Sequence, residues 1–330
     1  MSISLSVLDL APIGSGFTTS EALQQTTQLA QRAEQLGYTR LWLAEHHGMS
    51  SIASSSPEVL IAHVASATQR IRVGSGGIML PNHAPLRIAE AFHTLEALHP
   101  GRIDLGIGRA PGTDPATSSA LRPFDPEHFP SQMQELIGLS QRSLPEDHPF
   151  HSVRVVPDDV TLPPIWLLGS SGASARFAGE LGLGYGFASH FSHVSPEPAL
   201  QSYREHFKPS KAFPKPHVIL ALAAVCAETE EEAQYHAQTM DLVSVRLHQR
   251  QDGRIPTPEE AAAYPYTEAE RVIINSRRGL LHVGTPQKLK ETIEDIAQKT
   301  RADEIMISST IHDPQARIRS YELLAEELTL

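Results

Sequence analysis

The chain has 330 residues, 40% of them hydrophobic and 20% charged, so it is long enough to bury a large core and too apolar to be disordered. Its formal net charge of -11 argues against a protein that coats nucleic acid or an anionic membrane, because both need an excess of lysine and arginine. The single cysteine, Cys226, cannot form an internal disulfide, and neither a signal peptide nor a long apolar run is visible. We therefore expect a soluble cytoplasmic α/β protein.

Short apolar segments alternate with segments of helical periodicity along most of the chain. The apolar runs typical of strands lie at residues 3–8, 40–44, 71–74, 103–108, 165–168, 186–189, 217–226 and 304–308. Helical spacing or capping signals mark residues 18–36, 57–67, 85–98, 173–181, 287–297 and 313–328. About eight such units predict a parallel sheet covered by helices, and they favour a closed (β/α)8 TIM barrel over an open doubly wound sheet.

Two stretches do not fit this alternation. Residues 110–164 are rich in proline, and residues 243–282 are polar and interrupted by prolines. A minimal barrel needs about 250 residues, so the additional residues fit into these two insertions. Either insertion could cover a site or form a dimer contact. We expect residues 1–330 to form one barrel domain.

Titratable residues follow the second predicted strand, as Glu45-His46-His47. Barrel enzymes carry their chemistry on the loops after the strands, and histidine is the usual general base near neutral pH. A histidine with a packing role is the alternative. A metal site is not expected, because the chain has no HExxH motif and no His-x-His after the first strand.

Glycines and hydroxyl side chains follow three further strands. The adjacent glycines of Ser75-Gly76-Gly77 indicate either a bulge at a barrel corner or a place where a flat ring system lies on the backbone. The segment from Gly106 to Gly112 is not a dinucleotide fingerprint, because its spacing is wrong and Pro111 prevents a helix from starting there.

Arg109, within that segment, suits an anion, since its planar guanidinium matches phosphate. Gly169-Ser170-Ser171-Gly172-Ala173-Ser174 leads into a helix, so it reads either as a phosphate cradle or as an ordinary serine cap. Together with Arg109, this segment favours a phosphate on the cofactor or substrate.

These residues, in this order, resemble the bacterial luciferase-like flavin monooxygenases. The matching segments are Trp42 to His47, Val73 to Pro81, His83 to Glu90, Gly101-Arg102, Leu105 to Arg109, Gly169 to Ser174 and Val283 to Pro286. Segments in register over most of the chain are specific for the family, although not for a substrate. The two insertions match poorly. The luciferase subunits carry a cysteine where this chain has Gly108, which argues against light emission from a long-chain aldehyde but not against flavin binding.

The resemblance implies a (β/α)8 barrel that binds FMN, or reduced FMN, at the carboxyl ends of its strands. By that analogy Ser75, Gly76 and Gly77 lie along the isoalloxazine ring, and the Gly76–Gly77 peptide bond is cis. The positions that hold the flavin phosphate are matched by Arg109, Ser170, Ser171 and Ser174. His46 matches the catalytic histidine, and Glu45 would orient it or shape the local charge.

The leading hypothesis is a flavin-dependent monooxygenase in which reduced FMN reacts with O2 to give a C4a-(hydro)peroxide that oxygenates a small organic substrate. No NAD(P)H fingerprint is visible, so reduced flavin would come from a separate NAD(P)H:flavin reductase. The alternatives are an F420-dependent oxidoreductase on the same barrel, a flavin-binding protein without catalysis, and a metal-dependent barrel hydrolase. A homodimer is expected from the resemblance, and the substrate is left open.

Overall fold

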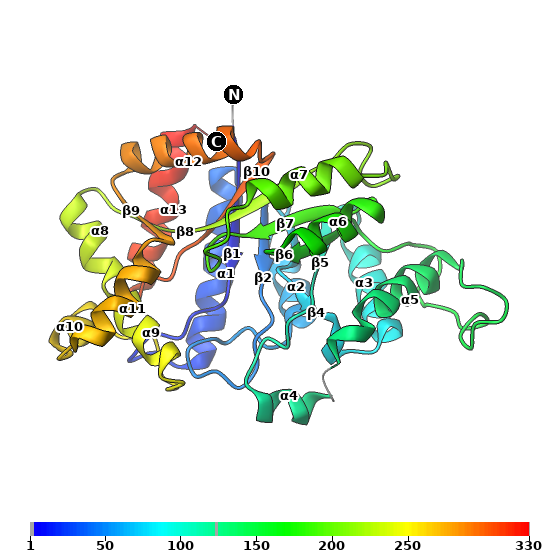
Figure 1. Ribbon diagram of the computed structural model, residues 1–330, viewed down its shortest axis with the longest axis horizontal. Helices are drawn as coiled ribbons and strands as arrows, with labels where there is room; N and C mark the ends of the chain where they lie inside the picture. Colours follow the sequence, from blue (N-terminus) through cyan, green and yellow to red (C-terminus); the bar gives the residue numbers. More distant parts are fainter. Residues whose placement is uncertain (1–2, 123–124, 330) are drawn as a thin grey trace.

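Eight parallel strands close into a barrel in the computed structural model, which describes residues 3–122 and 125–329 (Figure 1). The strands are β1 (Ser4–Asp9), β2 (Arg40–Leu43), β3 (Arg72–Ser75), β5 (Ile103–Gly108), β6 (Ile165–Gly169), β7 (Gly184–Ala188), β8 (Val218–Cys226) and β10 (Glu304–Ser308). Each pairs in parallel with the next, and β10 pairs with both β8 and β1, so the ring has no open edge. The predicted (β/α)8 barrel is confirmed.

Helices cover the outside of the barrel between successive strands. They are α1 (Thr19–Leu36), α2 (Pro57–Ala67), α3 (Pro85–Leu98), α5 (Phe129–Gln141), α6 (Gly172–Glu180), α7 (Glu197–His206), α12 (Pro286–Thr300) and α13 (Pro314–Leu328). Local signals set their ends, as in α1, where Thr18 and Glu21 form a capping box and Gly37 ends the helix at a φ of 88°. No helix within residues 3–122 and 125–329 is both long and apolar enough to cross a bilayer.

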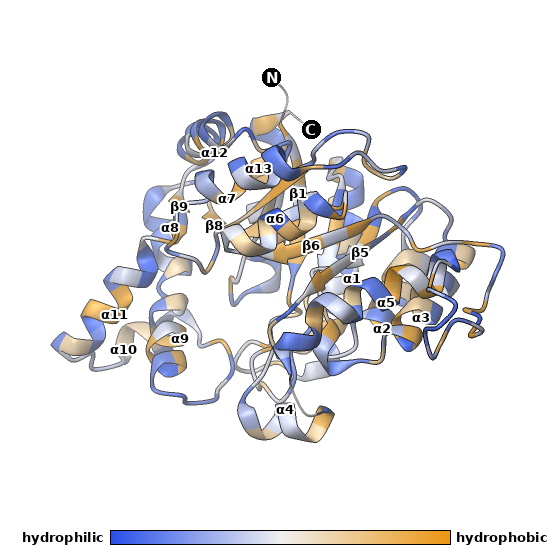
Figure 2. Ribbon diagram, turned by 45° about the vertical axis from the view of Figure 1, so that its right-hand side comes forward, coloured by the Kyte–Doolittle hydropathy of each residue, from blue (hydrophilic) through white to orange (hydrophobic). Residues whose placement is uncertain are grey.

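The apolar core has two layers. The larger layer lies between the strands and the surrounding helices, and apolar strands such as β6 and β8 contrast with the hydrophilic outer face of α12 (Figure 2). A smaller cluster joins side chains from opposite sides of the ring, including Trp42, Trp166 and Met306, so it fills the inside of the barrel. At the end of the barrel where the strands begin, Arg40 is paired with Asp104 at 2.7 Å and with Glu304 at 2.8 Å, and all three side chains are buried.

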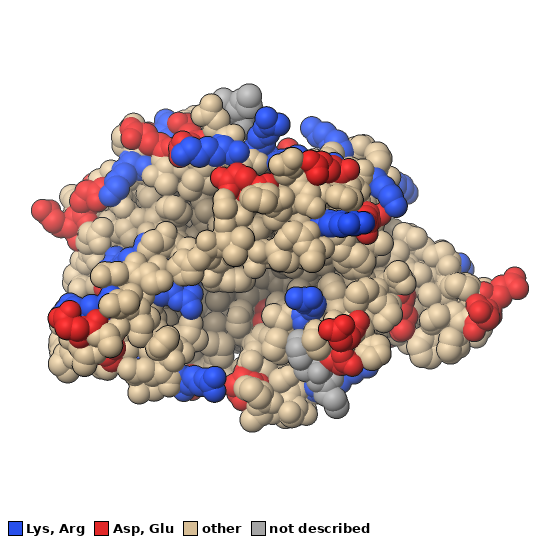
Figure 3. Space-filling model, viewed as in Figure 1, with Lys and Arg blue, Asp and Glu red and all other residues tan. Residues whose placement is uncertain are grey.

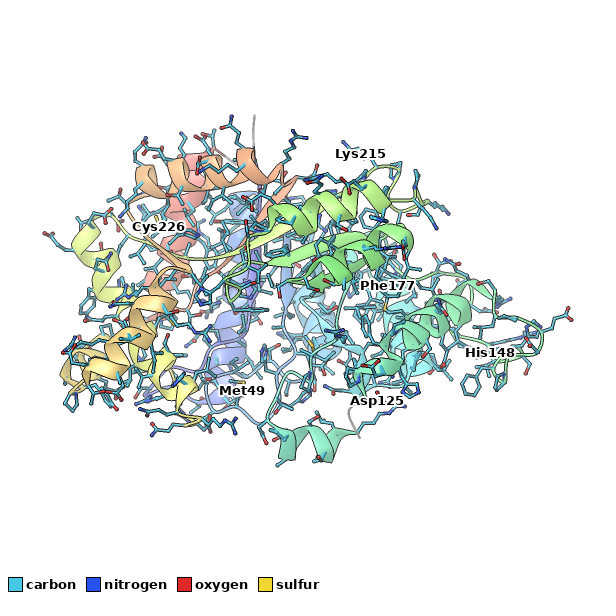
Figure 4. All side chains as sticks on the ribbon, viewed as in Figure 1. Met49, Asp125, His148, Phe177, Lys215 and Cys226 are labelled. Carbon is cyan, nitrogen blue, oxygen red and sulfur yellow. The ribbon has the colours of Figure 1, made fainter. Side chains whose placement is uncertain are left out.

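The first predicted insertion, residues 110–164, is only partly an insertion. It contains α4 (Pro115–Leu121), the short 3-10 helix η2 (Pro126–His128) and α5, which packs against α3 as the regular barrel helix between β5 and β6. Residues 142–164 have no regular element, and the part of this segment around His148 projects outward (Figure 4), whereas Val155 is buried in the core.

The second insertion lies over the loops at the carboxyl ends of the strands. Residues 243–282 include most of α9 (Thr239–His248), all of α10 (Pro258–Ala263) and α11 (Glu268–Arg278), and the start of β9 (Leu281–Gly284), which extends the sheet beside β8. The Ile255 amide donates to the carbonyl of Ile13 at 2.9 Å, and the Ser50 amide donates to the carboxylate of Asp252 at 2.9 Å. The insertion therefore covers the loops after β1 and β2.

The two ends of the barrel are distinguished in Figure 4 by Met49, in the loop after β2, and Lys215, in the loop before β8. The loop after β2 carries the predicted catalytic residues, so the end near Met49 is the mouth. Figure 3 shows a hollow near the centre of the molecule, between the side of α9 and α10 and the side of α4 and α5. The visible walls of this hollow are mostly uncharged, with basic side chains at two of its edges.

Candidate active site

The residues predicted to form the site all follow four neighbouring strands of the ring. Glu45 and His46 follow β2, Ser75 ends β3 with Gly76 and Gly77 after it, Arg109 follows β5, and Ser170, Ser171 and Ser174 follow β6. The ring order β2, β3, β5, β6 brings these strand ends to one side of the mouth. Continuing the register Ile107↔Leu167 by two residues places Arg109 opposite Gly169.

Glu45 is completely buried and accepts hydrogen bonds from four groups. Nε2 of His47 and Nε2 of His83 each lie 2.9 Å from Oε1, the Asn82 amide lies 3.2 Å from Oε1, and the backbone amide of Met79 lies 2.8 Å from Oε2. Burial alone would raise the pKa of Glu45, but the hydrogen bonds and charge of His83 and the bond from His47 outweigh it and lower the pKa below its ordinary value. The group is therefore an ionised carboxylate inside the protein.

His83 is the charged partner of this carboxylate. Burial lowers the pKa of His83, whereas the hydrogen bond and charge of Glu45 raise it, and the net pKa lies above its ordinary value. Asn82 also donates to the carbonyl of Pro111 at 3.0 Å, which ties the cluster to the loop after β5. A β-carbon at Gly112, whose φ is 68°, would come within 2.7 Å of the Glu45 carbonyl, so only glycine lets this loop approach so closely.

His46 points away from Glu45 and has no partner for its Nδ1 atom. This ring nitrogen is buried without a hydrogen bond to any described residue, although the His46 backbone amide donates to the Ser54 carbonyl at 2.9 Å. Burial lowers the pKa of His46, and this effect exceeds that of the Glu45 charge, which raises the pKa. Direct orientation of His46 by Glu45 does not occur, because the Glu45 carboxylate is held by His47 and His83. The influence of Glu45 on the local charge remains.

Ser75, Gly76 and Gly77 interrupt the strand that runs from β3 to the two-residue strand β4 (Ile78–Met79), which also pairs with β5. The Gly76–Gly77 peptide bond is cis, as predicted. A β-carbon at Gly76 would lie 2.7 Å from the Leu8 side chain, and one at Gly77 would lie 2.7 Å from the Gly106 carbonyl. Packing inside the barrel therefore requires glycine at position 77, where the β-carbon would meet backbone, whereas at position 76 the Leu8 side chain would have to move. The Ser75 hydroxyl donates to the Gly106 carbonyl at 2.7 Å, so its side chain is already engaged.

Arg109 is the free cation of the site. Its side chain is exposed and forms no hydrogen bond or ion pair with any described residue, and the Ser170 hydroxyl likewise has no partner within the described chain. Both groups can donate to a ligand. A β-carbon at Gly172, the first residue of α6, would meet nothing within 4 Å, so the amino end of this helix is open to an approaching group.

The other two serines of this segment are engaged. The Ser171 hydroxyl accepts from the Ser174 amide at 3.4 Å and caps α6. The Ser174 hydroxyl donates to the Ser171 carbonyl at 2.9 Å and lies 3.0 Å from the hydroxyl of Tyr185. A hydroxyl has one hydrogen to donate, so Ser174 is a structural residue of the helix start unless it gives up this bond.

Three polar residues of the mouth were not assigned a role from the sequence. Asn82 and His83 lie after β4, in a segment that matches the family, and their roles were not visible because their partner, Glu45, is far away in sequence. His190 lies two residues beyond β7. Its place after a strand was the one signal in the sequence, and that signal does not distinguish it from other histidines in loops.

A cavity of about 560 Å³ lies beneath the second insertion, next to the loop after β1. It is lined by Ser15, Leu242, Arg246, Asp252, Gly253, Arg254, Glu260 and Tyr264. None of the predicted site residues lines it. Within the described chain, no group of histidine, cysteine, aspartate and glutamate side chains has the arrangement of a metal site.

The fold and this arrangement of residues define a (β/α)8 barrel whose polar residues gather at the carboxyl ends of its strands. Residues 3–304 match the luciferase-like monooxygenase family, and the chain belongs to that family. A luciferase-like monooxygenase of Escherichia coli is 41% identical, with 97% of this chain and 96% of the relative aligned. The N-acetyl-S-alkylcysteine monooxygenase of Bacillus subtilis is 34% identical, with 98% of each chain aligned.

Solved structures share the same barrel. The crystal structure of apo-MsnO8 superimposes with a TM-score of 0.89 at 36% identity, covering 99% of this chain and 98% of the other. An FMN complex of the oxygenating constituent of 3,6-diketocamphane monooxygenase from Pseudomonas putida has a TM-score of 0.71 at 18% identity, covering 99% and 98% of the two chains. An F420-dependent secondary alcohol dehydrogenase has a TM-score of 0.66 at 14% identity, covering 99% of each. At 18% and 14% identity, the last two structures show only that the fold is shared.

Proposed function

We propose that this protein is a monooxygenase that uses reduced FMN and O2 to oxygenate a small organic molecule. Family membership supports the monooxygenase activity, and the free donor set of Arg109, Ser170 and the amino end of α6 supports a phosphorylated flavin. The observation that carries the choice of ligand is Arg109, an unpaired guanidinium opposite an open helix start. When bound, the flavin supplies the oxygen chemistry, and the protein supplies binding, orientation and the exclusion of water.

The residues present fit FMN. Its phosphate would accept from Arg109, from the Ser170 hydroxyl and from the first amides of α6, which have no partner within the helix. Its ring would lie against the backbone of Ser75, Gly76 and Gly77, where no side chain rises from the two glycines. Ser171 and Ser174 would act by holding the helix start rather than by direct contact with the phosphate.

His46 would act at the ring edge as a neutral imidazole. Since burial lowers its pKa, the ring is uncharged at neutral pH, and its unpartnered Nδ1 can accept or donate one proton. Glu45 would keep the loops after β2, β4 and β5 in place through His83 and Asn82. The Glu45–His83 pair is a positioning device behind the site.

The reduced flavin would be delivered by a separate NAD(P)H:flavin reductase, since the sequence shows no dinucleotide fingerprint. A second candidate is hydride transfer with F420, which a structure with the same barrel uses. F420 also carries a phosphate, so the donor set alone does not separate the two cofactors.

The deciding experiment is an anaerobic titration of the purified protein with photoreduced FMN and, separately, with reduced F420, followed by O2. We expect reduced FMN to bind, and O2 to be consumed at a rate that depends on the protein. We also expect Arg109→Ala to weaken this binding. Binding of F420 without protein-dependent O2 consumption from FMN would move the protein to the hydride-transfer class. Flavin binding with O2 chemistry unchanged from free flavin would favour a flavin-binding protein without catalysis.

A further inference from the structure

Two histidines follow strands on opposite sides of the barrel. His46 follows β2 and His190 follows β7, and three strands separate β2 from β7 in either direction around the closed ring. Residues at the same height after such strands lie on opposite sides of the opening. Burial lowers the pKa of His190, and the positive charge that His46 would carry if protonated lowers it further.

Polar atoms without partners lie in the loops after both strands. Nδ1 of His46, Nδ1 of His190 and the hydroxyl of Ser189 are all buried, and none forms a hydrogen bond with a described residue. Buried polar atoms are almost always paired in native proteins, so unpaired ones in a cleft indicate a ligand or ordered water. Here they come from two loops that only the closed barrel brings together.

The group they would bind is uncharged. Burial lowers the pKa of His190 to about 4, and a hydrogen bond from the ring to the Ala221 carbonyl, which raises the pKa, does not compensate, so the ring is neutral at physiological pH and Nδ1 is its unpaired atom. Among the described residues no carboxylate pairs with His190, in contrast to His83, whose pKa Glu45 raises. A neutral imidazole beside a hydroxyl offers one donor and one acceptor to a carbonyl, amide or hydroxyl group, and offers no countercharge to an ion.

We propose that Ser189 and His190 are substrate-binding residues that hold an uncharged polar group of the organic substrate opposite His46. This inference rests on the proposed function for the identity of the reaction, but the binding site stands on this chain's own residues. The ring of Phe191, edge-on to His190 with centroids 4.6 Å apart, stacks beside it and is 55% exposed, so the same loop also offers an apolar surface to the substrate.

The first test uses stability. An unpaired buried polar atom costs stability, so replacing it with an apolar side chain of similar size is neutral or stabilising. Ser189→Ala removes an unpaired hydroxyl without touching the bond between His190 and the Ala221 backbone, so we expect this variant to unfold at the same temperature as the wild type or a higher one. A clear loss of stability would mean that the Ser189 hydroxyl has partners within the protein, and it would overturn the proposal.

The second test uses small probes and carbon-13-labelled histidine, observed by NMR in the FMN-free and FMN-loaded protein. N-methylacetamide should shift the His190 resonance, and acetate at the same concentration should not. His190→Asn keeps a polar atom near the Nδ1 position, so it should bind N-methylacetamide nearly as well as the wild type. In this variant, binding is measured by the shift of the His46 resonance. His190→Gln, with its polar atom near Nε2, and His190→Leu should bind it about tenfold more weakly.

A shift caused by acetate instead of the amide, or no shift with either probe, would overturn the proposal. Equal binding by the asparagine, glutamine and leucine variants would do the same. Flavin affinity is measured in parallel on every variant. Absence of FMN binding by the wild type would refute the proposed function, whereas the stability and probe results on FMN-free protein would still decide the roles of Ser189 and His190.

Discussion

Replacement of Glu45 by glutamine tests the buried cluster behind the mouth. The carboxylate accepts from Met79, Asn82, His47 and His83, whereas a glutamine amide has one acceptor oxygen and turns a donating NH2 toward groups that already donate. Removing one partner of a buried ion pair costs about 3–5 kcal/mol. His83 is 23% exposed in its side chain, so we take the lower value of about 3 kcal/mol for the loss of unfolding free energy.

The loss should depend on pH in a defined direction. The pKa of His83 is raised above 6.5, so its contribution is complete below that value and disappears as the pH rises through the raised pKa. The pKa of Glu45 is lowered below 4.5, so its contribution is complete above that value and disappears as the pH falls through the lowered pKa. The difference between wild type and variant should therefore be greatest between pH 4.5 and 6.5.

The assay is urea unfolding followed by fluorescence and by circular dichroism, at about pH 5.5 and about pH 9, with agreement of the two probes as the condition for a free energy. The matched control is Glu146→Gln, an exposed glutamate with no hydrogen bond to a described residue, for which we expect a change within about 0.5 kcal/mol. A Glu45→Gln effect no larger than that of the control, or one that grows from about pH 5.5 to about pH 9, would refute the assignment of an ionised pair.

Three further outcomes are expected. Arg109→Ala should weaken FMN binding about 10- to 100-fold, as expected for a lost charge-assisted hydrogen bond, whereas Ser174→Ala should change it by less than about threefold; flavin fluorescence titration separates the two. His46→Ala should retain FMN affinity and lose about 100-fold or more of product formation, and unchanged turnover would remove its assigned role. Gly77→Ala should destabilise the protein by about 1–3 kcal/mol, because its β-carbon would contact the Gly106 carbonyl at 2.7 Å. Gly172→Ala, with nothing within 4 Å of the β-carbon, should leave the melting temperature unchanged.

Barrel strands were readable from the sequence because strands buried on both faces are short apolar runs. The predicted strand 103–108 coincides with β5, and 304–308 coincides with β10. α5 was missed because Pro126 and Pro130 made its start look like a loop. Proline is compatible with the first turn of a helix, and here it stands beside Phe129 at that turn. The second insertion could not be placed, since its contacts with Ile13 and Ser50 join segments about two hundred residues apart.

The site could be predicted at the level of strand ends but not of hydrogen bonds. Positions after β2, β3, β5 and β6 follow from the alternation of strands and helices, and the location of the cis bond at Gly76–Gly77 followed from the resemblance. The engagement of the Ser174 hydroxyl depends on Tyr185, and that of Glu45 depends on His83. These partners lie on other strands or loops, and only the folded barrel brings them together.

The Glu45-His46-His47 motif shows how three adjacent titratable residues can serve two purposes. The bond between Glu45 and His47 joins side chains two residues apart, as on one side of an extended segment. Glu45 and His47 therefore lie on one side and bond to each other at 2.9 Å, and His46 lies on the other side with Nδ1 free. The hydrogen bonds of the Glu45 carboxylate lie behind the site, where they hold the loops after β2, β4 and β5 in place. The histidine between them is left neutral with Nδ1 unpaired, which suits the role that we propose for it. Inserting or deleting one residue before Glu45 would exchange the two sides, and would place a buried carboxylate where the flavin ring is proposed to lie.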